Sequence, residues 1–531
     1  MGKKEPVFII ILLITCYTLF FFRLESRPLW DIDEATHAVV SKEMILSGDW
    51  ITPTFNGEPF YDKPVFHSWL VALCFLLFGF SEFAARLPSA VLATGCVMVT
   101  CLLGRRLFSA TVGFLSGIIL ATAIEFIVIA RSVVQDISLL FFITFALYFF
   151  YAGYANRRHR TLSLLIFYAA LGFAVLSKGP VGLAVPAVTI GLYLIFLKDF
   201  GFIKQMKMGW GTLVFLTVAA PWYILISIKN PGYATYFFIE RNIGSFLSAT
   251  KRHPEPFYYY IPVFFGGFFP WSCFLPPAIF YAFRRRREAD GQKVLYPAIW
   301  FTVVFVFFSS AGSKLATYIL PLFPAAALLV AKLWHELMSS SQSNIRKVFI
   351  ITFLPVGVVF LAAAAYLWVN PPAALESESG LNPNYLKHCA VWLAGCAVLA
   401  LVFLLKKKEN ACFTAIAAMI VATLLIFLLV FAPAINPYRS TKELAGQYNL
   451  LAHKDEPFVF YGRILESALF YFSRKAVVLD TPQQLEKYLN SKKRVYCILT
   501  TKDLRRLANL KKSFDIVGQQ GNRYLITNKV M

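Results

Sequence analysis

Four carboxylates lie within thirteen residues, directly after the first apolar segment of the chain. They are Asp31, Asp33, Glu34 and Glu43. At a membrane boundary, a carboxylate can take a proton from an attacking hydroxyl group, or help to hold a divalent cation or a sugar. Asp33 is therefore our first catalytic candidate, and Asp136, which follows a later apolar segment, is the second. Helix capping is the alternative for both side chains.

Basic and aromatic side chains lie at other segment boundaries. Lys63 precedes a proline and Lys178 precedes Gly-Pro, and snorkelling to the interface is the alternative reading of both. Lys314 and Tyr318 are spaced to share one face of a helix, where they would form a phosphate clamp or an interfacial anchor. A lysine can neutralise a phosphate as a point charge. We expect these four residues, with Arg241 from a polar loop, to bind a phosphate.

The composition places these residues in a membrane protein. Of 531 residues, 58% are hydrophobic and only 15% are charged, and many apolar runs approach the roughly 20 residues that cross a bilayer. The formal charge of +22 does not indicate nucleic-acid binding, because the basic residues form short clusters between apolar runs. It suits anionic lipid headgroups or a phosphate substrate. We predict a polytopic α-helical membrane protein.

Basic clusters also predict the topology. Lys3 and Lys4 keep the N-terminus in the cytoplasm. If the short run at 65–80 is an interfacial helix, nearly every later basic cluster falls inside, and the chain crosses thirteen times. The predicted spans cover about 7–23, 86–104, 111–131, 137–155, 162–177, 180–197, 210–228, 258–282, 294–309, 315–333, 347–369, 389–405 and 411–432.

This topology divides the chain into two domains. Residues 1–435 form the transmembrane domain, in which 24–64 is the first periplasmic loop. Residues 436–531 are mixed polar, with β-rich runs such as "EPFVFYG", "KAVVLD", "RVYCILT" and "RYLITN" between helical stretches, and predict a small periplasmic α/β domain. The candidate residues gather on the periplasmic face, where ionisable groups at membrane depth usually have a function.

Several blocks carry a family resemblance. "RPLWDIDEATHAVVSKEMILSGDWITPTFNGEPFYDKPVFHSW" is similar to the first periplasmic loop of the lipid A aminoarabinose transferases and of the wider protein O-mannosyltransferase-like group. "FGFSEFAARLPSA", "SKGPVGL" and "SKLATYILPLFPA" resemble later blocks in the same order. The resemblance implies a C-type glycosyltransferase fold with juxtamembrane helices in the first loop. It also implies an inverting glycosyltransferase of the bacterial inner membrane that uses a sugar linked to undecaprenyl phosphate or a similar polyprenyl phosphate.

The resemblance extends to single residues. It matches Asp33 and Asp136 to the family's functional aspartates, Lys63 to its donor-phosphate lysine, Asp62 to the acid before it, and Tyr318 to a late tyrosine. Glu34, His37, Tyr61 and Glu240 are the residues that we expect to contact the acceptor or the sugar. A divalent metal, zinc or magnesium, would have Asp62 and His253 as candidate ligands. Aminoarabinose transferases carry a histidine metal ligand in the loop after the seventh span, where this chain has Asn242 and Ser245.

Three functions remain open at this point. The first is the glycosyltransferase, with lipid A, another glycolipid or a protein hydroxyl as acceptor. The second is a transporter or flippase for lipid-linked sugars, a class that usually shows symmetric repeats and broken helices near the midplane, neither of which this sequence predicts. The third is a sensor whose C-terminal domain binds a partner. No P-loop or Gly-rich dinucleotide turn occurs in a fitting context, so no nucleotide cofactor is expected.

Overall fold

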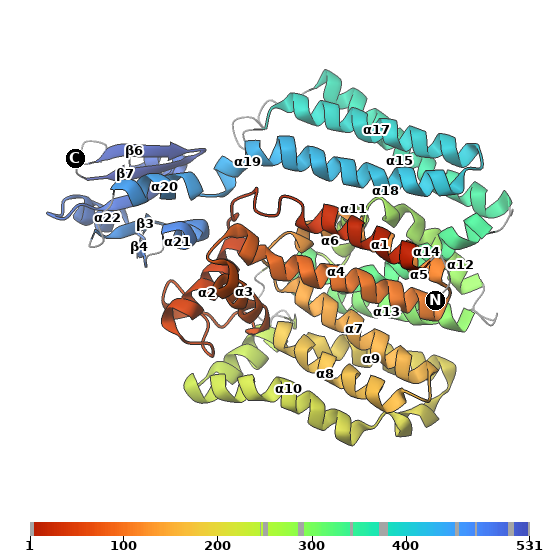
Figure 1. Ribbon diagram of the computed structural model, residues 1–531. Helices are drawn as coiled ribbons and strands as arrows, with labels where there is room; N and C mark the ends of the chain where they lie inside the picture. Colours follow the sequence, from red (N-terminus) through yellow and green to blue (C-terminus); the bar gives the residue numbers. More distant parts are fainter. Residues whose placement is uncertain are drawn as a thin grey trace.

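The computed structural model describes residues 5–244, 246–247, 253–284, 291–339, 343–370, 381–451, 456–472, 475–507 and 514–528. Two parts are visible in Figure 1: a body of long helices, and a small sheet domain at one end of it, with α2 and α3 beside the sheet domain. In the described ranges, nine helices are long and apolar enough to cross a membrane, or eleven if two bent pairs each count as one span.

The long helices fall where apolar runs predicted them. They are α4 (Glu82–Leu107), α7 (Asp136–Ala155), α8 (Arg160–Lys178), α10 (Met208–Lys229), α13 (Gly291–Ser310), α14 (Phe323–Ser339), α15 (Ser343–Val369), α17 (Pro383–Leu405) and α18 (Glu409–Ile426). Two shorter apolar helices, α1 (Glu5–Cys16) with η1 (Tyr17–Phe21) and α9 (Val181–Leu197), occupy predicted spans 1 and 6. The count of thirteen spans stays a prediction.

Two predicted continuous spans are broken. The first bend, of 70°, lies between α5 (Ala110–Ala121) and α6 (Ile124–Ala130). The second, of 113°, lies between α11 (Tyr260–Gly267) and the segment Trp271–Arg284, which contains η4 (Trp271–Phe274) and α12 (Leu275–Arg284). At the second break Pro270 cannot donate a helical hydrogen bond. At the first, Thr122 accepts a hydrogen bond from Trp271 Nε1 at 2.9 Å. The expectation that the chain has no broken helices is therefore wrong.

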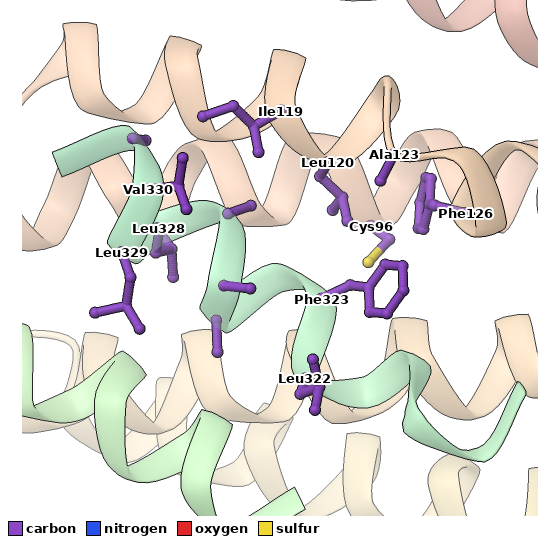
Figure 2. Packing of buried hydrophobic residues seen from close by; sticks show 14 of the residues in the cluster. Cys96, Ile119, Leu120, Ala123, Phe126, Leu322, Phe323, Leu328, Leu329 and Val330 are labelled. Carbon is purple, nitrogen blue, oxygen red and sulfur yellow. The ribbon is translucent and has the colours of Figure 1, made fainter. Parts of the chain in front are cut away.

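Small residues let the central helices approach closely. A Cβ added to Gly113 of α5 would lie 2.4 Å from the carbonyl oxygen of Cys101 in α4, so these two backbones are in direct contact. Figure 2 shows the core beside them, where Leu120 and Phe126 lie near Phe323, the first residue of α14. α10 and α15 instead carry exposed large apolar side chains, such as Trp210 and Ile351, as a lipid-facing surface requires.

The C-terminal domain is a five-stranded mixed sheet with the order β4-β3-β5-β7-β6. β3 (Phe458–Tyr461) pairs in parallel with β4 (Val477–Leu479) and β5 (Tyr496–Thr500), and β7 (Arg523–Thr527) pairs antiparallel with β5 and with β6 (Asp515–Gln520). Four of these strands follow the predicted runs; β6 was not predicted. The helices of this domain are α20 (Lys442–Leu451), α21 (Glu466–Phe472), α22 (Pro482–Leu489) and α23 (Thr501–Arg506).

The sheet domain and the first loop share one hydrophobic core. Ala38 and Val39 of α2 (Asp33–Ser47) and Phe75 of α3 (Phe66–Phe78) pack with Phe470 of α21 and Phe460 of β3. Lys42 Nζ also donates to the carbonyl oxygen of Phe470 at 2.6 Å. The helix that begins with Asp33 is therefore held from both sides, by the membrane domain and by the sheet domain.

Candidate active site

The structure directs the four carboxylates of the first loop to different partners. Asp31 binds the C-terminal domain, Glu34 binds α4, and Glu43 accepts hydrogen bonds at 2.7 and 3.0 Å within the hairpin of β1 (Thr54–Phe55) and β2 (Glu58–Pro59). Asp33 is exposed at the first turn of α2, and its carboxylate forms no hydrogen bond or ion pair with any residue that the structure describes. Only Asp33 of the four is thus available to a substrate.

Glu34 has a structural role. Its carboxylate accepts a hydrogen bond from Arg86 Nε at 2.7 Å and lies 3.6 Å from Arg27. Burial alone would raise the pKa of Glu34, but the two guanidinium groups hold it below its usual range. The same Arg86 donates to three carbonyl oxygens of the loop before α2. The expectation that Glu34 contacts the acceptor or the sugar is therefore corrected: this carboxylate is taken up by a buried ion pair.

His37 marks the place where the candidate charges converge. It lies one turn after Asp33 and is 8% exposed. Burial, and then the positive charge of Lys63, lower its pKa to about 4, against the attraction of Asp33, Asp136 and Asp62. These charges come from α2, from the end of the first loop and from the start of α7, so the structure brings them to one site. His37 is neutral there at neutral pH and can act as a hydrogen-bond donor or acceptor.

Asp136 and Lys178 form a short ion pair at the ends of α7 and α8. Asp136 and Asp33 are the first residues of α7 and α2, one position after the N-cap residues Gln135 and Ile32, and the only described hydrogen bond to either carboxylate comes from Lys178. Capping is therefore excluded for both aspartates. Lys178 Nζ lies 3.9 Å from the centre of the Tyr318 ring, and Lys63 Nζ lies 5.9 Å from the same centre. The ring face favours two ammonium groups close together.

Asp62 and Tyr61 extend the site toward the chain after α10. Asp62 accepts a hydrogen bond from Arg241 at 2.8 Å, in the π-helical segment η3 (Thr235–Gly244). Tyr61 donates to the side chain of Asn230 at 3.0 Å, which joins the first loop to the end of α10. Arg241 is thereby held beside Lys63, although the two residues are nearly 180 positions apart in the sequence.

A pocket of about 420 Å³ opens beside these cations. Lys63, Lys178, Arg241 and Tyr318 line it, and the rest of its wall is mostly apolar. The apolar lining comprises Pro64, Pro180, Val181, Ala184, Phe237, Phe238, Ile243, Phe246, Leu247, Phe307, Phe308 and Ala311. A cationic end with an apolar wall suits a ligand with a phosphate head and a hydrocarbon chain.

Three predicted residues lie outside this group. Lys314 is 5% exposed, and its Nζ donates to the carbonyl oxygens of Ala311 and Glu255 at 2.6 and 3.0 Å. The helical segment η5 (Ala316–Leu322) begins after Lys314, so the prediction that Lys314 and Tyr318 share a helix face is wrong. Glu240 and His253 are exposed, and their roles stay predictions.

The predicted metal site does not fit the side chains that are present. Asp62 is paired with Arg241, His253 is exposed, and the described residues contain no group of three or more His, Cys, Asp or Glu side chains that could hold a metal ion. Asn242 donates to the carbonyl oxygen of Phe237 at 2.6 Å, and Ser245 lies outside the described residues. No step of the chemistry below is therefore assigned to a metal.

Sequence reasoning missed two supports of the site. His67 is fully buried, and its Nδ1 lies 2.8 Å from Ser138 Oγ, a contact that joins α3 to α7. Gly179 follows Lys178 with a φ of +81°, and a Cβ there would lie 2.9 Å from the ring of Phe237. The Gly in "SKGP" was the available signal for the second; a histidine in an apolar run gives little signal for the first.

Comparison with known proteins identifies the family. Residues 62–225 match the family model described as dolichyl-phosphate-mannose-protein mannosyltransferase. An undecaprenyl phosphate-α-4-amino-4-deoxy-L-arabinose arabinosyl transferase from Aeromonas salmonicida is 30% identical over 403 residues, which are 75% of this chain and 73% of the relative. The chain belongs to this transferase family. It is a glycosyltransferase and a multi-pass membrane protein.

Other relatives and solved structures agree. The corresponding transferase from Shewanella sediminis is 27% identical and matches 90% of this chain and 87% of its own. The crystal structure of ArnT from Cupriavidus metallidurans bound to undecaprenyl phosphate superposes with a TM-score of 0.83 at 23% identity, covering 100% of this chain and 99% of that one. This likeness confirms the predicted C-type glycosyltransferase fold.

Proposed function

We propose that the transferase moves a sugar from undecaprenyl phosphate, or a similar polyprenyl phosphate, to an envelope glycolipid, with lipid A as the first candidate acceptor. The observation that carries the proposal is the pocket in which Lys63, Lys178 and Arg241 meet an apolar wall, with His37 subject to the charges of both Lys63 and Asp33. A phosphate fits the cations, and a prenyl chain fits the wall. The names of the relatives, which specify undecaprenyl phosphate and an arabinose derivative, support this donor.

The chemistry needs positioning and charge more than covalent participation. The acceptor oxygen attacks the anomeric carbon from the face opposite the phosphate, and the bond between that carbon and the phosphate oxygen breaks with inversion. The electron pair of that bond leaves with the polyprenyl phosphate, and the three cations neutralise the growing negative charge. If the acceptor is a hydroxyl group, its proton passes to Asp33. If the acceptor is a phosphate, it needs no base, and Asp33 orients it.

The pairing within the site assigns the remaining roles. Asp136 holds Lys178 against Tyr318, and Asp62 holds Arg241, so each acid positions one cation. His37, neutral and buried, is placed to orient the acceptor or the sugar. In the proposed topology the N-terminus is cytoplasmic, and the site and the C-terminal domain are periplasmic. The basic clusters between the predicted spans support this orientation.

A protein hydroxyl is the second candidate acceptor. The match to the family model supports it, because that model is described as a protein mannosyltransferase. The matched residues, 62–225, include Lys63, Asp136 and Lys178. Mass spectrometry of envelope lipids and of envelope proteins, with and without the gene, separates the two acceptors. A sugar lost from lipid A alone supports the first, and a sugar lost from proteins alone supports the second.

The substitution Asp33→Asn tests the proposed transfer in detergent, where no compartments exist and a transporter would give no product. We expect transfer from a polyprenyl-phosphate sugar to a hydroxyl acceptor to fall at least about 100-fold, as for loss of a general base. Binding of the donor should be unchanged. Glu58→Gln, an exposed carboxylate in the same loop, is the control and should keep full transfer. Wild-type transfer by the Asp33 variant would overturn the proposal.

A further inference from the structure

A second pocket, of about 580 Å³, lies between the C-terminal sheet and the first loop. It opens at the carboxyl ends of β3 and β5. These strands are parallel neighbours, and β4 lies on the other side of β3. After β3 the chain forms β4 on one side of β3, and it then crosses over to form β5 on the other side. In open α/β sheets, ligands bind in the crevice at this reversal of strand order.

Three arginines line this pocket, together with two acids that already accept hydrogen bonds from the protein. Asp503 accepts hydrogen bonds from the backbone and the side chain of Thr500 at 3.0 and 2.5 Å. Asp31 accepts from Arg523 at 2.8 Å and from Ser467 N at 2.6 Å. Both oxygens of Asp31 and one oxygen of Asp503 are thus engaged within the protein. With three guanidinium groups against two carboxylates, the lining carries an excess of positive charge.

The arginines have N–H groups that can donate hydrogen bonds to a ligand. Arg523 is 7% exposed, and its Nη1 is buried with no hydrogen-bond partner among the described residues. Arg463 reaches its nearest carboxylate, that of Glu466, only at 3.8 Å and is largely exposed. Arg439, the last residue of α19 (Ala432–Arg439), is exposed as well. A buried guanidinium nitrogen without an acceptor costs free energy that an anionic ligand would recover.

The shape and the remaining lining define the ligand class. A guanidinium fork matches a phosphate with two parallel hydrogen bonds. The pocket is larger than a single phosphate needs, and Tyr461, Thr500 and Asn522 add groups that can hydrogen-bond sugar hydroxyls. We propose that this pocket binds a phosphorylated sugar, separately from the donor site. Its neighbour α19 continues the last apolar helix, so the sugar of a membrane glycolipid can reach it as readily as a soluble sugar phosphate.

Saturation-transfer NMR on the full-length protein in nanodiscs tests the proposal, with glucose 1-phosphate as the probe. We expect binding by the wild type, and a dissociation constant at least tenfold weaker for Arg463→Gln and for Arg523→Gln. Arg463 is exposed, so its variant should fold even if loss of the buried Arg523 destabilises the domain. Arg505→Gln, an exposed arginine of α23 outside the pocket, is the matched control and should bind as the wild type does. Lys63→Met, which alters the donor site, should also leave the signal intact.

The outcomes separate the alternatives. Displacement of glucose 1-phosphate by lipid A in the nanodisc, but not by its dephosphorylated form, supports a glycolipid source. Binding without such displacement supports a soluble source. Binding of inorganic phosphate with no preference for the sugar phosphate would overturn the ligand class. A signal that Lys63→Met abolishes, or that both pocket variants leave unchanged, would overturn the site itself. None of these results depends on the proposed transfer.

Discussion

At the scale of single residues, the site is built from opposite charges that restrain one another. Asp136 holds Lys178, Asp62 holds Arg241, and the Tyr318 ring lies within 6 Å of two ammonium groups. Asp33 enters the site with its carboxylate unpaired in the described chain. The cations are therefore positioned before a phosphate arrives, and the ordering cost is met in folding.

The pair of Asp136 and Lys178 predicts a split between binding and turnover. Lys178→Met should raise the dissociation constant of undecaprenyl phosphate at least about tenfold, because a charged hydrogen bond contributes roughly 1.5–3 kcal/mol. Asp136→Asn should keep or tighten that binding while it slows transfer, since it releases Lys178 to the phosphate. Lys229→Met, which breaks an exposed pair with Asp49, is the control and should change neither. Isothermal titration measures the binding, and equal weakening by both site variants would contradict the assigned roles.

His37 predicts a loss of stability in acid. Its pKa is about 4 in the folded protein, below the ordinary value of 6.5. Between these values the unfolded chain binds a proton that the folded protein does not, so stability falls as the pH falls. At pH 5 this amounts to about 2 kcal/mol. Thermal unfolding in detergent at pH 7 and pH 5 should show a smaller acid loss for His37→Asn than for the wild type. Parallel losses would show that His37 does not carry this effect.

At the scale of elements, Arg86 of α4 fixes the segment that leads into α2. It is 1% exposed and donates to Glu34 and to the carbonyl oxygens of Leu24, Arg27 and Pro28. One membrane helix thus shapes the loop from which the proposed base projects. A buried ion pair is weak evidence for stability by itself, but removal of one partner leaves a buried charge.

Arg86→Met should therefore be severely destabilising. It leaves Glu34 buried without its closest cation, and the expected cost is about 3–5 kcal/mol. Arg105→Met on the same helix breaks an exposed pair with Glu5 and should cost at most about 1 kcal/mol. Thermal unfolding of the two purified variants measures the difference. Similar melting temperatures would show that the contacts of Arg86 are dispensable.

At the scale of the whole molecule, the sheet domain is fastened to the first loop through Asp31. Arg523 in β7 and Ser467 in α21 both hydrogen-bond this carboxylate. Around it, α21 packs on α2 in their shared core (Figure 1). The C-terminal domain thus packs against one side of the loop that carries Asp33.

Asp31→Ala should weaken this interface between the C-terminal domain and the first loop. The variant leaves the buried Arg523 without its carboxylate partner. Hydrogen exchange should therefore rise over α21 and β7, while α4 and α7 keep their protection. Glu443→Gln, an exposed carboxylate of α20, is the control and should leave the pattern unchanged. Exchange that rises equally in all four elements would instead indicate a general loss of stability.

The sequence predicted the architecture better than the pairing of charges. Apolar runs located most long helices, and ionisable groups at their ends identified Asp33, Lys63, Asp136 and Lys178. The roles of Asp31 and Glu34 could not be predicted, because their partners lie 492 and 52 residues away in the chain. The bend after Ala121 was missed for the same reason: its hydrogen bond comes from Trp271. Long-range pairing of this kind leaves no local pattern.

The ion pair of Asp31 with Arg523 also bears on the order of synthesis. Asp31 leaves the ribosome 492 residues before its partner Arg523. Until then, two unpaired carboxylates stand two residues apart at the start of α2, and the nascent loop lacks its final anchor. A chain that stops before β7 would insert its helices in the bilayer yet leave this loop without its contact to Arg523, so the first loop is completed only after β7 has been made.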